Sequence, residues 1–446
     1  MVGQTDPVRV RGRVSRVVGT VIEGEMPDCA VGQMCRLVAG EERRTILAEI
    51  VGFQDRRVIL MPLGEMRGLR PGSLIEVLDS APRVRVGEGL LGRVLDGMGA
   101  PLDGGPTPAH ETEVPLYRTP GNPYNRRRIF EPLDVGVRSV NALVTICVGQ
   151  RMAIMAGSGV GKSVLLGMIA RHTAADVNVI CLVGERGREL KDFLERDLGP
   201  QGLRRSVVIA ATSEVSPLIR VRSAFIATAI AEHFRSKGKH VLLMMDSVTR
   251  FAMAQREVGL AVGEPPTSKG YTPSVFSLLP RLLERVGMAD EGEAGSITGL
   301  YAVLVEGDDF TEPIADAVRA ILDGHVVLSR DLADQGHYPA VDVLSSVSRL
   351  MPDVVSGEHM QWAMRVQGLL AAYRRAETLI NIGAYAPGSN PEIDAAIRMI
   401  GPINHFLRQP VSERSDFAQS RQGLQTLAET PIEPVPFASP RGAAMR

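Results

Sequence analysis

The sequence is poor in aromatic residues, in cysteine and in net charge. Aromatic side chains make up only 4% of the 446 residues, four residues are cysteine, and 50 basic residues nearly balance 51 acidic ones. This balance excludes a strong overall attraction to nucleic acid or to an anionic membrane, because such binding depends on a basic surplus. The scarcity of aromatic residues also argues against a surface that stacks on nucleic acid bases.

Neither the cysteines nor the apolar residues follow the patterns of a metal-binding, secreted or membrane protein. No pair of cysteines has the spacing of a zinc site and no histidines flank them, so we expect reduced thiols. The first residues lack the apolar core of a signal peptide, and no stretch reaches the ~18 apolar residues of a membrane span. We therefore expect a cytoplasmic protein. The four cysteines are Cys29, Cys35, Cys147 and Cys181.

The apolar residues divide the chain into three folded regions, and its length suits about three ordinary domains. Residues 1–96 alternate short apolar runs with glycines, which is typical of a small all-β barrel. A proline-rich connector opens residues 97–355, where apolar strands alternate with helical stretches and predict an α/β domain with a mostly parallel sheet. Residues 356–430 have helical spacing, and we expect the tail 431–446 to be disordered. The expected central strands are 151–156, 177–183, 206–210, 240–245, 299–305 and 325–328.

Two smaller patterns refine this division. In the helical region Met360, Met364 and Leu369 have the spacing of one helix face, and Asn390 before Pro391 marks the start of a further helix. In the connector, the isolated charge run at residues 126–128, three arginines, is expected to face solvent.

The segment AGSGVGKS, which begins at Ala156, lies between an expected strand and a helical pattern. A glycine-rich turn in that position lets backbone N–H groups converge on a polyphosphate, with the positive end of the helix dipole behind them. Lys162 would reach the β and γ phosphates, and the Ser163 hydroxyl would bind Mg²⁺. Ala156 replaces a customary glycine, but it ends the strand, where a small side chain suffices. The expected nucleotide-binding residues are Gly157, Ser158, Gly159, Val160, Gly161, Lys162, Ser163 and Val164.

Acidic residues follow two other expected strands. Asp246 comes directly after the apolar strand 240–245, where a carboxylate can hold the metal from its other side. The charged segment GERGRE, from Gly184 to Glu189, follows the strand 177–183. Because ligands bind at the carboxyl edge of open α/β sheets, a carboxylate there could orient the water that attacks the γ phosphate.

These segments and several others occur in an order that resembles a known family. GRVLDGMGAPLDG, AGSGVGKS, GERGRE, MMDSVTRFA, ILDGHVVLSR and YPAVDVLSSVSR look like the catalytic β-type subunits of rotary ATP synthases and the type III protein secretion ATPases. Within that group, residues 133–171 most resemble the ATPase of the flagellar export apparatus. The resemblance implies an N-terminal all-β barrel, a central RecA-like P-loop ATPase domain and a C-terminal α-helical domain.

The resemblance also implies roles for individual residues, with ATP and Mg²⁺ bound at the site. Glu185 matches the carboxylate that positions the attacking water, and non-catalytic subunits of the rotary enzymes lack it. Arg186 matches a phosphate-contacting arginine, and Glu189 would lie near the water shell of the metal. Tyr338 matches an aromatic residue that stacks on adenine. Arg349 matches an arginine finger delivered into a neighbouring subunit, so activity should depend on assembly.

The implied partners are those of a flagellar export ATPase. They are further copies of the chain in a homohexamer, an export regulator or stator protein, a coiled-coil stalk protein, the membrane export gate, and export chaperones and substrates. Hydrolysis would release substrates and deliver them to the gate, at the cytoplasmic face of the inner membrane and without binding specific nucleic acid. One departure is at Gln409-Pro410-Val411, where relatives often carry an adenine-facing phenylalanine in the last position.

Three other functions remain as alternatives. An ATPase of a virulence injectisome shares the architecture. A nucleic-acid motor of the Rho type also joins a small barrel to a hexameric core, but the first 96 residues contain only one aromatic side chain, Phe53. A catalytic subunit of a rotary synthase is disfavoured because the C-terminal region has no strongly acidic segment.

Overall fold

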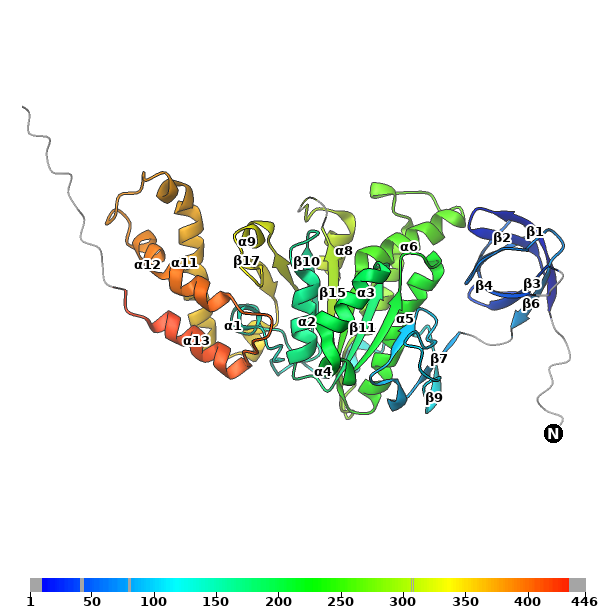
Figure 1. The fold of residues 1–446 in the computed structure, drawn as a ribbon, viewed down its shortest axis with the longest axis horizontal. Coiled ribbons are helices and arrows are strands. Elements are labelled where there is room, and N and C mark those ends of the chain that lie inside the picture. Colours follow the sequence, from blue (N-terminus) through cyan, green and yellow to red (C-terminus); the bar gives the residue numbers. More distant parts are fainter. Residues whose placement is uncertain (1–9, 41–43, 79–81, 306, 308, 433–446) are drawn as a thin grey trace, which may run out of the picture.

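The computed structural model describes residues 10–40, 44–78, 82–305, 307 and 309–432 of the chain. A barrel, a central α/β domain and a helical domain follow one another along the long axis, in the order of the sequence (Figure 1). All but the first two residues of the expected disordered tail, 431–446, lie outside the described residues. Among the described residues, no helix combines the length and the hydropathy needed to cross a membrane.

The N-terminal part is a closed barrel of six strands in the order β1-β2-β5-β4-β3-β6, as the sequence predicted. Ile22, Leu37 and Leu60 lie completely buried in its interior. Closing the sheet pairs every strand on both sides, so no strand edge is left for other chains. The strands are β1 (Arg11–Val18), β2 (Val21–Glu25), β3 (Met34–Ala39), β4 (Arg44–Gln54), β5 (Arg57–Pro62) and β6 (Leu74–Leu78).

The barrel ends earlier than the expected boundary at residue 96. Its last strand, β6, stops at Leu78. Strand β8 (Val94–Asp96) is parallel to β12 (Ser206–Ala211) at the edge of the central sheet, and β7 (Arg83–Val86) pairs with β9 (Thr112–Pro115) outside the barrel. These short strands look like barrel strands in the sequence, but their pairing partners assign them to the central domain.

The central domain is built on a sheet with the strand order β17-β16-β10-β15-β13-β11-β12-β8. All neighbours along this path are parallel except β16 and β17, and β14 adds an antiparallel pairing to β15. The six expected strands are all present, with ends shifted by a few residues at most, whereas β17 was not predicted. The remaining strands are β10 (Arg151–Ala156), β11 (Val177–Val183), β13 (His240–Asp246), β14 (Gly287–Met288), β15 (Ser296–Leu304), β16 (Gly324–Leu328) and β17 (Val341–Ser348).

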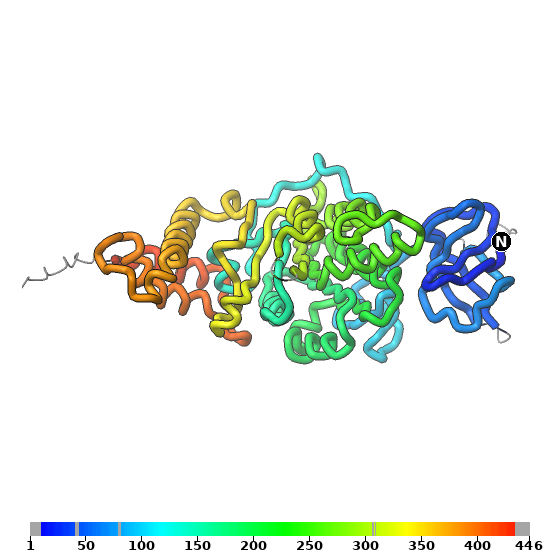
Figure 2. The backbone as a smooth tube through the Cα atoms, turned by 90° about the horizontal axis from the view of Figure 1, so that it is seen from above, coloured from blue at the N-terminus to red at the C-terminus, as the bar shows by residue number. Residues whose placement is uncertain are grey.

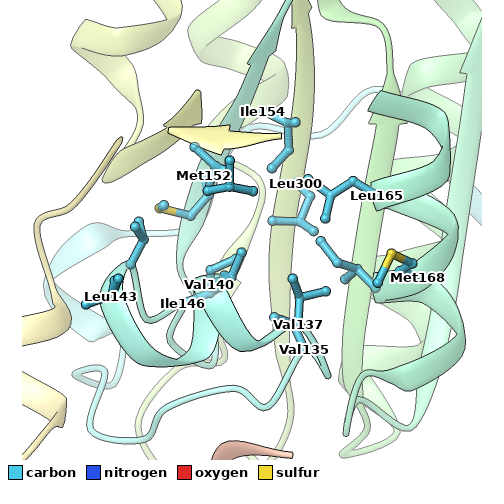
Figure 3. Packing of buried hydrophobic residues seen from close by; sticks show 14 of the residues in the cluster. Val135, Val137, Val140, Leu143, Ile146, Met152, Ile154, Leu165, Met168 and Leu300 are labelled. Atoms are coloured by element: carbon cyan, nitrogen blue, oxygen red, sulfur yellow. The ribbon is translucent and has the colours of Figure 1, made fainter. Parts of the chain in front are cut away.

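The sheet separates two hydrophobic cores. In β10, Met152 and Ile154 belong to one core, whereas Ala153 and Met155 belong to the other. Figure 3 shows the first core, where Met152, Ile154 and Leu300 lie close to side chains from helices α1 and α2. Because both faces of the strands are buried, apolar residues run continuously along each strand rather than alternating with polar ones.

Helices cover both faces of the sheet. Helices α1 and α2 contribute to the first core, and α5, α6, α7 and α8 contribute to the second. The helices of the central domain are α1 (Arg138–Leu143), α2 (Lys162–His172), α3 (Gly187–Asp192), α4 (Gly199–Arg204), α5 (Pro217–Ser236), α6 (Val248–Ala261), α7 (Pro273–Leu283), α8 (Pro313–Ile321), α9 (Arg330–Asp334) and α10 (Met351–Val354), with the π-helical turn η3 (Phe193–Leu198).

The C-terminal domain consists of three packed helices, α11 (Gly357–Asn381), α12 (Pro391–Leu407) and α13 (Phe417–Glu429). The Asn390 side chain caps α12 as predicted, by accepting hydrogen bonds from the backbone N–H groups of Glu392 and Ile393. The residues expected on one face of α11 do not share one environment, because Met364 is exposed whereas Leu369 is buried. The buried face of this helix is instead lined mainly by small side chains, including those of Ala363 and Ala372.

The arginine run in the connector does not face solvent throughout. Arg126 donates hydrogen bonds to the carbonyl oxygens of Val286, at 2.9 Å, and Glu284. Arg127 donates to the carbonyl oxygen of Gly295 at 2.9 Å. Only the third arginine of the run is exposed. The first two arginines therefore fix the connector to the central domain, which a charge run cannot reveal without its tertiary partners.

A buried ion pair joins the barrel to the central domain. The Arg222 guanidinium, on α5, donates a hydrogen bond to Glu49 Oε2, on β4, at 2.6 Å. Both side chains are more than 90% buried. Burial raises the pKa of Glu49, and the positive charge of Arg222 opposes that rise. Each charge is therefore tolerated in the interface only because the other is present.

We expect Arg222→Met to lower the free energy of unfolding by about 3–5 kcal/mol, because it leaves the Glu49 carboxylate buried without a partner. Glu49→Gln combined with Arg222→Met should recover most of that loss. Arg375→Ala breaks an exposed pair with Glu392 and should cost at most about 1 kcal/mol. Urea denaturation measures all three, and a loss for Arg222→Met no larger than that of Arg375→Ala would contradict the argument.

Candidate active site

The expected phosphate loop connects the carboxyl end of β10 to the start of α2. Gly159 and Gly161 have φ angles of 80° and 93°, which side chains rarely permit, and Gly161 is the N-cap of α2. The first N–H groups of an 11-residue helix therefore open onto the loop without intrahelical partners. Together with the helix dipole, they form an environment that attracts a phosphate group.

The other loop residues divide into buried and accessible ones. Ala156 and Val160 are buried, so they contribute packing and backbone atoms rather than side-chain contacts. Ser158 is exposed, and its carbonyl oxygen accepts a hydrogen bond from Arg330 at 3.1 Å. Ser163, in the first turn of α2, is also exposed, so its hydroxyl is accessible to a bound metal.

Lys162 and Asp246 meet although 84 residues separate them in the sequence. The Lys162 ammonium group donates to Asp246 Oδ1 at the end of β13, and both side chains are largely buried. Strand β15 lies between β10 and β13, so parallel register brings both strand ends to one edge of the sheet. The structure thus brings together the lysine and the aspartate that the sequence assigned to phosphate and metal.

Glu185 lies beside this pair, in the loop that follows β11. Its side chain is mostly buried, and Arg250 Nε on α6 lies 3.3 Å from its Oε1. Arg250 also donates a hydrogen bond to the carbonyl oxygen of Gly184. The sequence analysis missed Arg250, although its place one turn after Asp246 on α6 was a signal that it would reach the same edge.

The environment of Glu185 favours its protonated form. Burial raises its pKa to about 8, helped by a hydrogen bond with Glu189 and by the negative charge of Asp246. The positive charges of Lys162 and Arg250 only partly oppose this rise. The same hydrogen bond lowers the pKa of Glu189, as expected if Glu185 carries the proton that the two carboxyl groups share. A carboxyl group poised in this range is suited to proton transfer near neutral pH.

Arg186 and Glu189 lie at the outer rim of the site. The Arg186 side chain is 74% exposed, and its guanidinium lies 3.9 Å from the Glu189 carboxylate. Glu189 is one turn into α3 and only partly buried. Both side chains are accessible from solvent, so a bound nucleotide or its water shell can reach them.

Tyr338 lies next to the phosphate loop from a distant part of the chain. A Cβ atom added at Gly161 would lie 3.7 Å from the Tyr338 ring, and the ring is about half exposed. The backbone carbonyl oxygen of Tyr338 accepts a hydrogen bond from Gln409 N at 3.0 Å. Val411 supplies no second aromatic ring, and the nearby Phe406 is buried against the C-terminal domain. Beside the phosphate loop, Tyr338 is therefore the exposed aromatic side chain that could stack on a nucleobase.

Arg349 does not reach the phosphate loop of its own chain. It follows β17, whose end, Ser348, pairs with Gly324 at the amino end of β16. The Arg349 N–H donates to the carbonyl oxygen of Asp323 at 3.0 Å. Because β16 is parallel to β10, this exposed arginine lies at the amino edge of the sheet, a strand length of about 15 Å from the edge that carries the loop.

The oxygen donors at the site suit Mg²⁺. In the described part of the chain, no group of three or more His, Cys, Asp or Glu side chains could hold a metal ion. Mg²⁺ in nucleotide-binding proteins needs no such cage, because it is held by one or two protein oxygens, by water and by the phosphates. The Ser163 hydroxyl and the Asp246 carboxylate offer those two oxygens.

Family models match three segments of the chain. The beta-barrel domain of the ATP synthase alpha/beta family matches residues 14–78, and the nucleotide-binding domain of that family matches 136–348. The T3SS EscN ATPase C-terminal domain matches residues 355–426. These matches follow the barrel, the central domain and the helical domain of the structure.

Similar proteins extend over nearly the whole chain. The flagellum-specific ATP synthase of Bacillus subtilis is 51% identical over 95% of this chain and 96% of its own length. The type 3 secretion system ATPase of Xanthomonas euvesicatoria is 49% identical over 94% of both chains. The assembled ATPase EscN of the enteropathogenic E. coli type III secretion system superposes with a TM-score of 0.88, at 43% identity over 94% of this chain and 100% of that chain.

We expect kcat/KM for ATP hydrolysis to rise with pH through a midpoint near 8, because Glu185 must lose its proton before it can act as a base. Glu189→Gln should move the midpoint to lower pH, since it removes the carboxylate that stabilises the protonated form. Glu195→Gln, an exposed carboxyl group two turns away, should leave the midpoint unchanged. If kcat/KM of the unmodified protein does not change over ~3 pH units around this midpoint, Glu185 is not the base.

Proposed function

This chain belongs to the family of flagellum-specific ATP synthases and type III secretion ATPases, and we propose that it powers the flagellar branch of protein export. It is an ATPase, and hydrolysis would promote the release of export substrates from their chaperones and their delivery to the export gate. The observation that carries the proposal is the buried carboxyl group of Glu185 beside the Lys162–Asp246 pair. A site for nucleotide binding alone has no need of a poised base.

The names of the relatives favour the flagellar branch over the injectisome. Flagellum-specific ATP synthases from Bacillus subtilis, Pseudomonas aeruginosa and Salmonella typhimurium are 50–51% identical to this chain over 94–95% of its length. The type 3 secretion system ATPase of Xanthomonas euvesicatoria follows at 49%, and EscN at 43%. An injectisome ATPase is therefore the second candidate, and it shares every residue role proposed below.

The proposed mechanism uses the residues at the carboxyl edge of the sheet. Lys162 would leave Asp246 to contact the β and γ phosphates, and the freed Asp246 carboxylate and the Ser163 hydroxyl would then hold Mg²⁺. The metal would neutralise charge that develops on the phosphates. Glu185 would accept a proton from the attacking water, and Arg250 would keep the Glu185 carboxylate in place. Arg186 would contact the phosphates from the rim, and Glu189 would bind the metal's water shell.

A second copy of the chain would complete the site. Arg349 lies at the edge of the sheet opposite to the phosphate loop, so it can act only on a nucleotide held by a neighbour. An arginine supplied in this way raises hydrolysis rates about 10³- to 10⁵-fold in other phosphate-loop enzymes. We infer a ring of six, which is supported by the similarity to the assembled EscN structure. Tyr338 would stack on the adenine of the nucleotide bound to its own chain.

Other partners follow from the export role. A stalk protein is supported by the EscN structure in complex with its central stalk EscO, which superposes with a TM-score of 0.85, at 42% identity over 94% of this chain and 100% of that chain. The export regulator, the membrane gate, chaperones and substrates complete the proposed set. We place the ring at the cytoplasmic face of the inner membrane. The low aromatic content and balanced charge continue to disfavour a nucleic-acid motor.

We expect Lys162→Ala and Arg349→Ala to be inactive alone and to recover ATPase activity when mixed. A pair of neighbours then combines the intact phosphate loop of the Arg349→Ala chain with the intact finger of the Lys162→Ala chain. Activity per subunit of the unmodified protein should also rise with protein concentration. If the mixture stays inactive while both variants assemble, as measured by size-exclusion chromatography with light scattering, the shared site is wrong.

We expect deletion of the gene in its native host to abolish flagellar filaments and swimming, because hook and filament subunits would no longer be exported. Reintroduced Lys162→Ala should fail to restore swimming, whereas Lys269→Ala, which removes an exposed lysine paired with Asp309, should restore it. Normal filaments in the deletion strain together with a loss of effector secretion would assign the chain to the injectisome.

A further inference from the structure

The connector strap, residues 118–131, carries the two most exposed large hydrophobic side chains among the described residues. Tyr124 is 91% exposed and Phe130 is 70% exposed, and Ile382 follows at 69%. Single exposed apolar side chains are common, but two aromatic rings on one short segment are unusual in a chain with only 4% aromatic residues. Figure 2 shows the strap as a cyan segment along one side of the central domain.

Hydrogen bonds hold the strap in place along its length. Glu291 N donates to the carbonyl oxygen of Asn125 at 2.8 Å, and Arg127 N donates to the carbonyl oxygen of Ala289 at 3.1 Å. At the far end, the carbonyl oxygen of Glu131 accepts from Val148 N at 2.9 Å. The two rings are therefore presented on fixed backbone, which lowers the entropy lost when a partner binds them.

A chain of polar contacts connects the strap to Arg349. Arg126 donates to the Glu284 carbonyl oxygen, and the Glu284 carboxylate lies 2.5 Å from Arg151. Arg151 forms an ion pair with Asp323 at 3.2 Å, and the Asp323 carbonyl oxygen accepts from Arg349 N at 3.0 Å. Arg151 begins β10 and Asp323 precedes β16, so this whole network lies along the amino edge of the sheet.

We propose that the connector strap is part of the contact between subunits, with Tyr124 and Phe130 seated on a second copy of this chain. The proposal rests on the shared site proposed above. If Arg349 enters the neighbour's site, the amino edge of one sheet faces the carboxyl edge of the next, and groups that project from the same edge are buried there. Aromatic side chains near the centre of an interface supply a large share of its binding energy.

The surface beside Phe130 suits such a contact. Phe130 borders a hollow of about 380 Å³, whose lining combines the apolar side chains of Val148 and Met288 with charged and polar ones, namely Arg127, Arg128, Glu131, His240 and Glu291. A side chain of the neighbour can enter this hollow beside the ring, with apolar contact to Val148 and Met288 and with charged groups in reach for polar contacts. We assign the partner of the strap as a second copy of the chain. The Arg126–Arg349 network connects the strap to the amino edge of the sheet, and that edge faces the neighbouring subunit in the proposed shared site.

The first test is Tyr124→Ser combined with Phe130→Ser, measured as ATPase activity per subunit against protein concentration. We expect the concentration for half-maximal activity to rise at least about 10-fold, with activity restored at high concentration and an unchanged melting temperature. Met364→Ser combined with Ile382→Ser removes two other exposed apolar side chains, on and after α11, and should leave the curve unchanged. A curve for the strap variant that matches the unmodified protein would overturn the inference.

The second test determines which of two neighbouring subunits supplies the strap at each contact. In a mixture of Lys162→Ala and Arg349→Ala chains, every complete site takes its finger, and with it the strap, from the Lys162→Ala chain. The two strap substitutions should therefore raise the protein concentration needed for half of the recovered activity about 10-fold when placed on that chain, and leave it largely unchanged when placed on the Arg349→Ala chain. Equal effects on both chains, or none, would overturn the role of the strap. Failure of the parent mixture would instead overturn the shared site itself.

Discussion

Parallel strands give the central sheet two chemically different edges, because β10, β11, β13, β15 and β16 all run in one direction between the two cores. The carboxyl edge gathers the phosphate loop, Asp246 and Glu185. The amino edge carries Arg349, fixed through Asp323 and Arg151. The same apolar strands carry both edges, so the packing of the two cores determines where the residues at each edge lie.

Burial raises the pKa of a carboxyl group in two parts of the molecule, and each carboxyl group has different charged neighbours. Between the barrel and the central domain, Glu49 and Arg222 compensate each other, and the result is a fixed joint. At the site, burial raises the pKa of Glu185, the hydrogen bond with Glu189 and the charge of Asp246 add to that rise, and Lys162 and Arg250 only partly oppose it. A buried carboxyl group whose charge is only partly balanced by cations lowers the stability of the fold, but its pKa lies close to neutral pH. The proposed role of Glu185 as a base would therefore use a raised pKa that its cationic neighbours do not cancel.

Local patterns in the sequence predicted the parts of the structure that depend on neighbouring residues. The phosphate loop, the six central strands and the Asn390 cap each follow from a short stretch of chain. The boundary at residue 96, the strand β17 and the anchored arginines of the connector depend on partners far away in the sequence. The sequence pattern of β17 is weak because the polar residues Asp342 and Ser346 are buried, whereas the apolar Val347 is exposed. Arg250 was missed for the same reason, since its role appears only where α6 passes the loop after β11.

If Arg349 serves the site of a neighbour as proposed, its placement on the edge opposite to the phosphate loop would make association between copies head-to-tail rather than two-fold symmetric. Each added subunit would then donate an arginine finger on one side and receive one on the other. An open row of subunits therefore always has one fewer complete site than it has members, and only closure converts the last half-site into a working one. In such an assembly, closing the ring would complete the last active site. A chain altered on a single edge would end the row of subunits at that point.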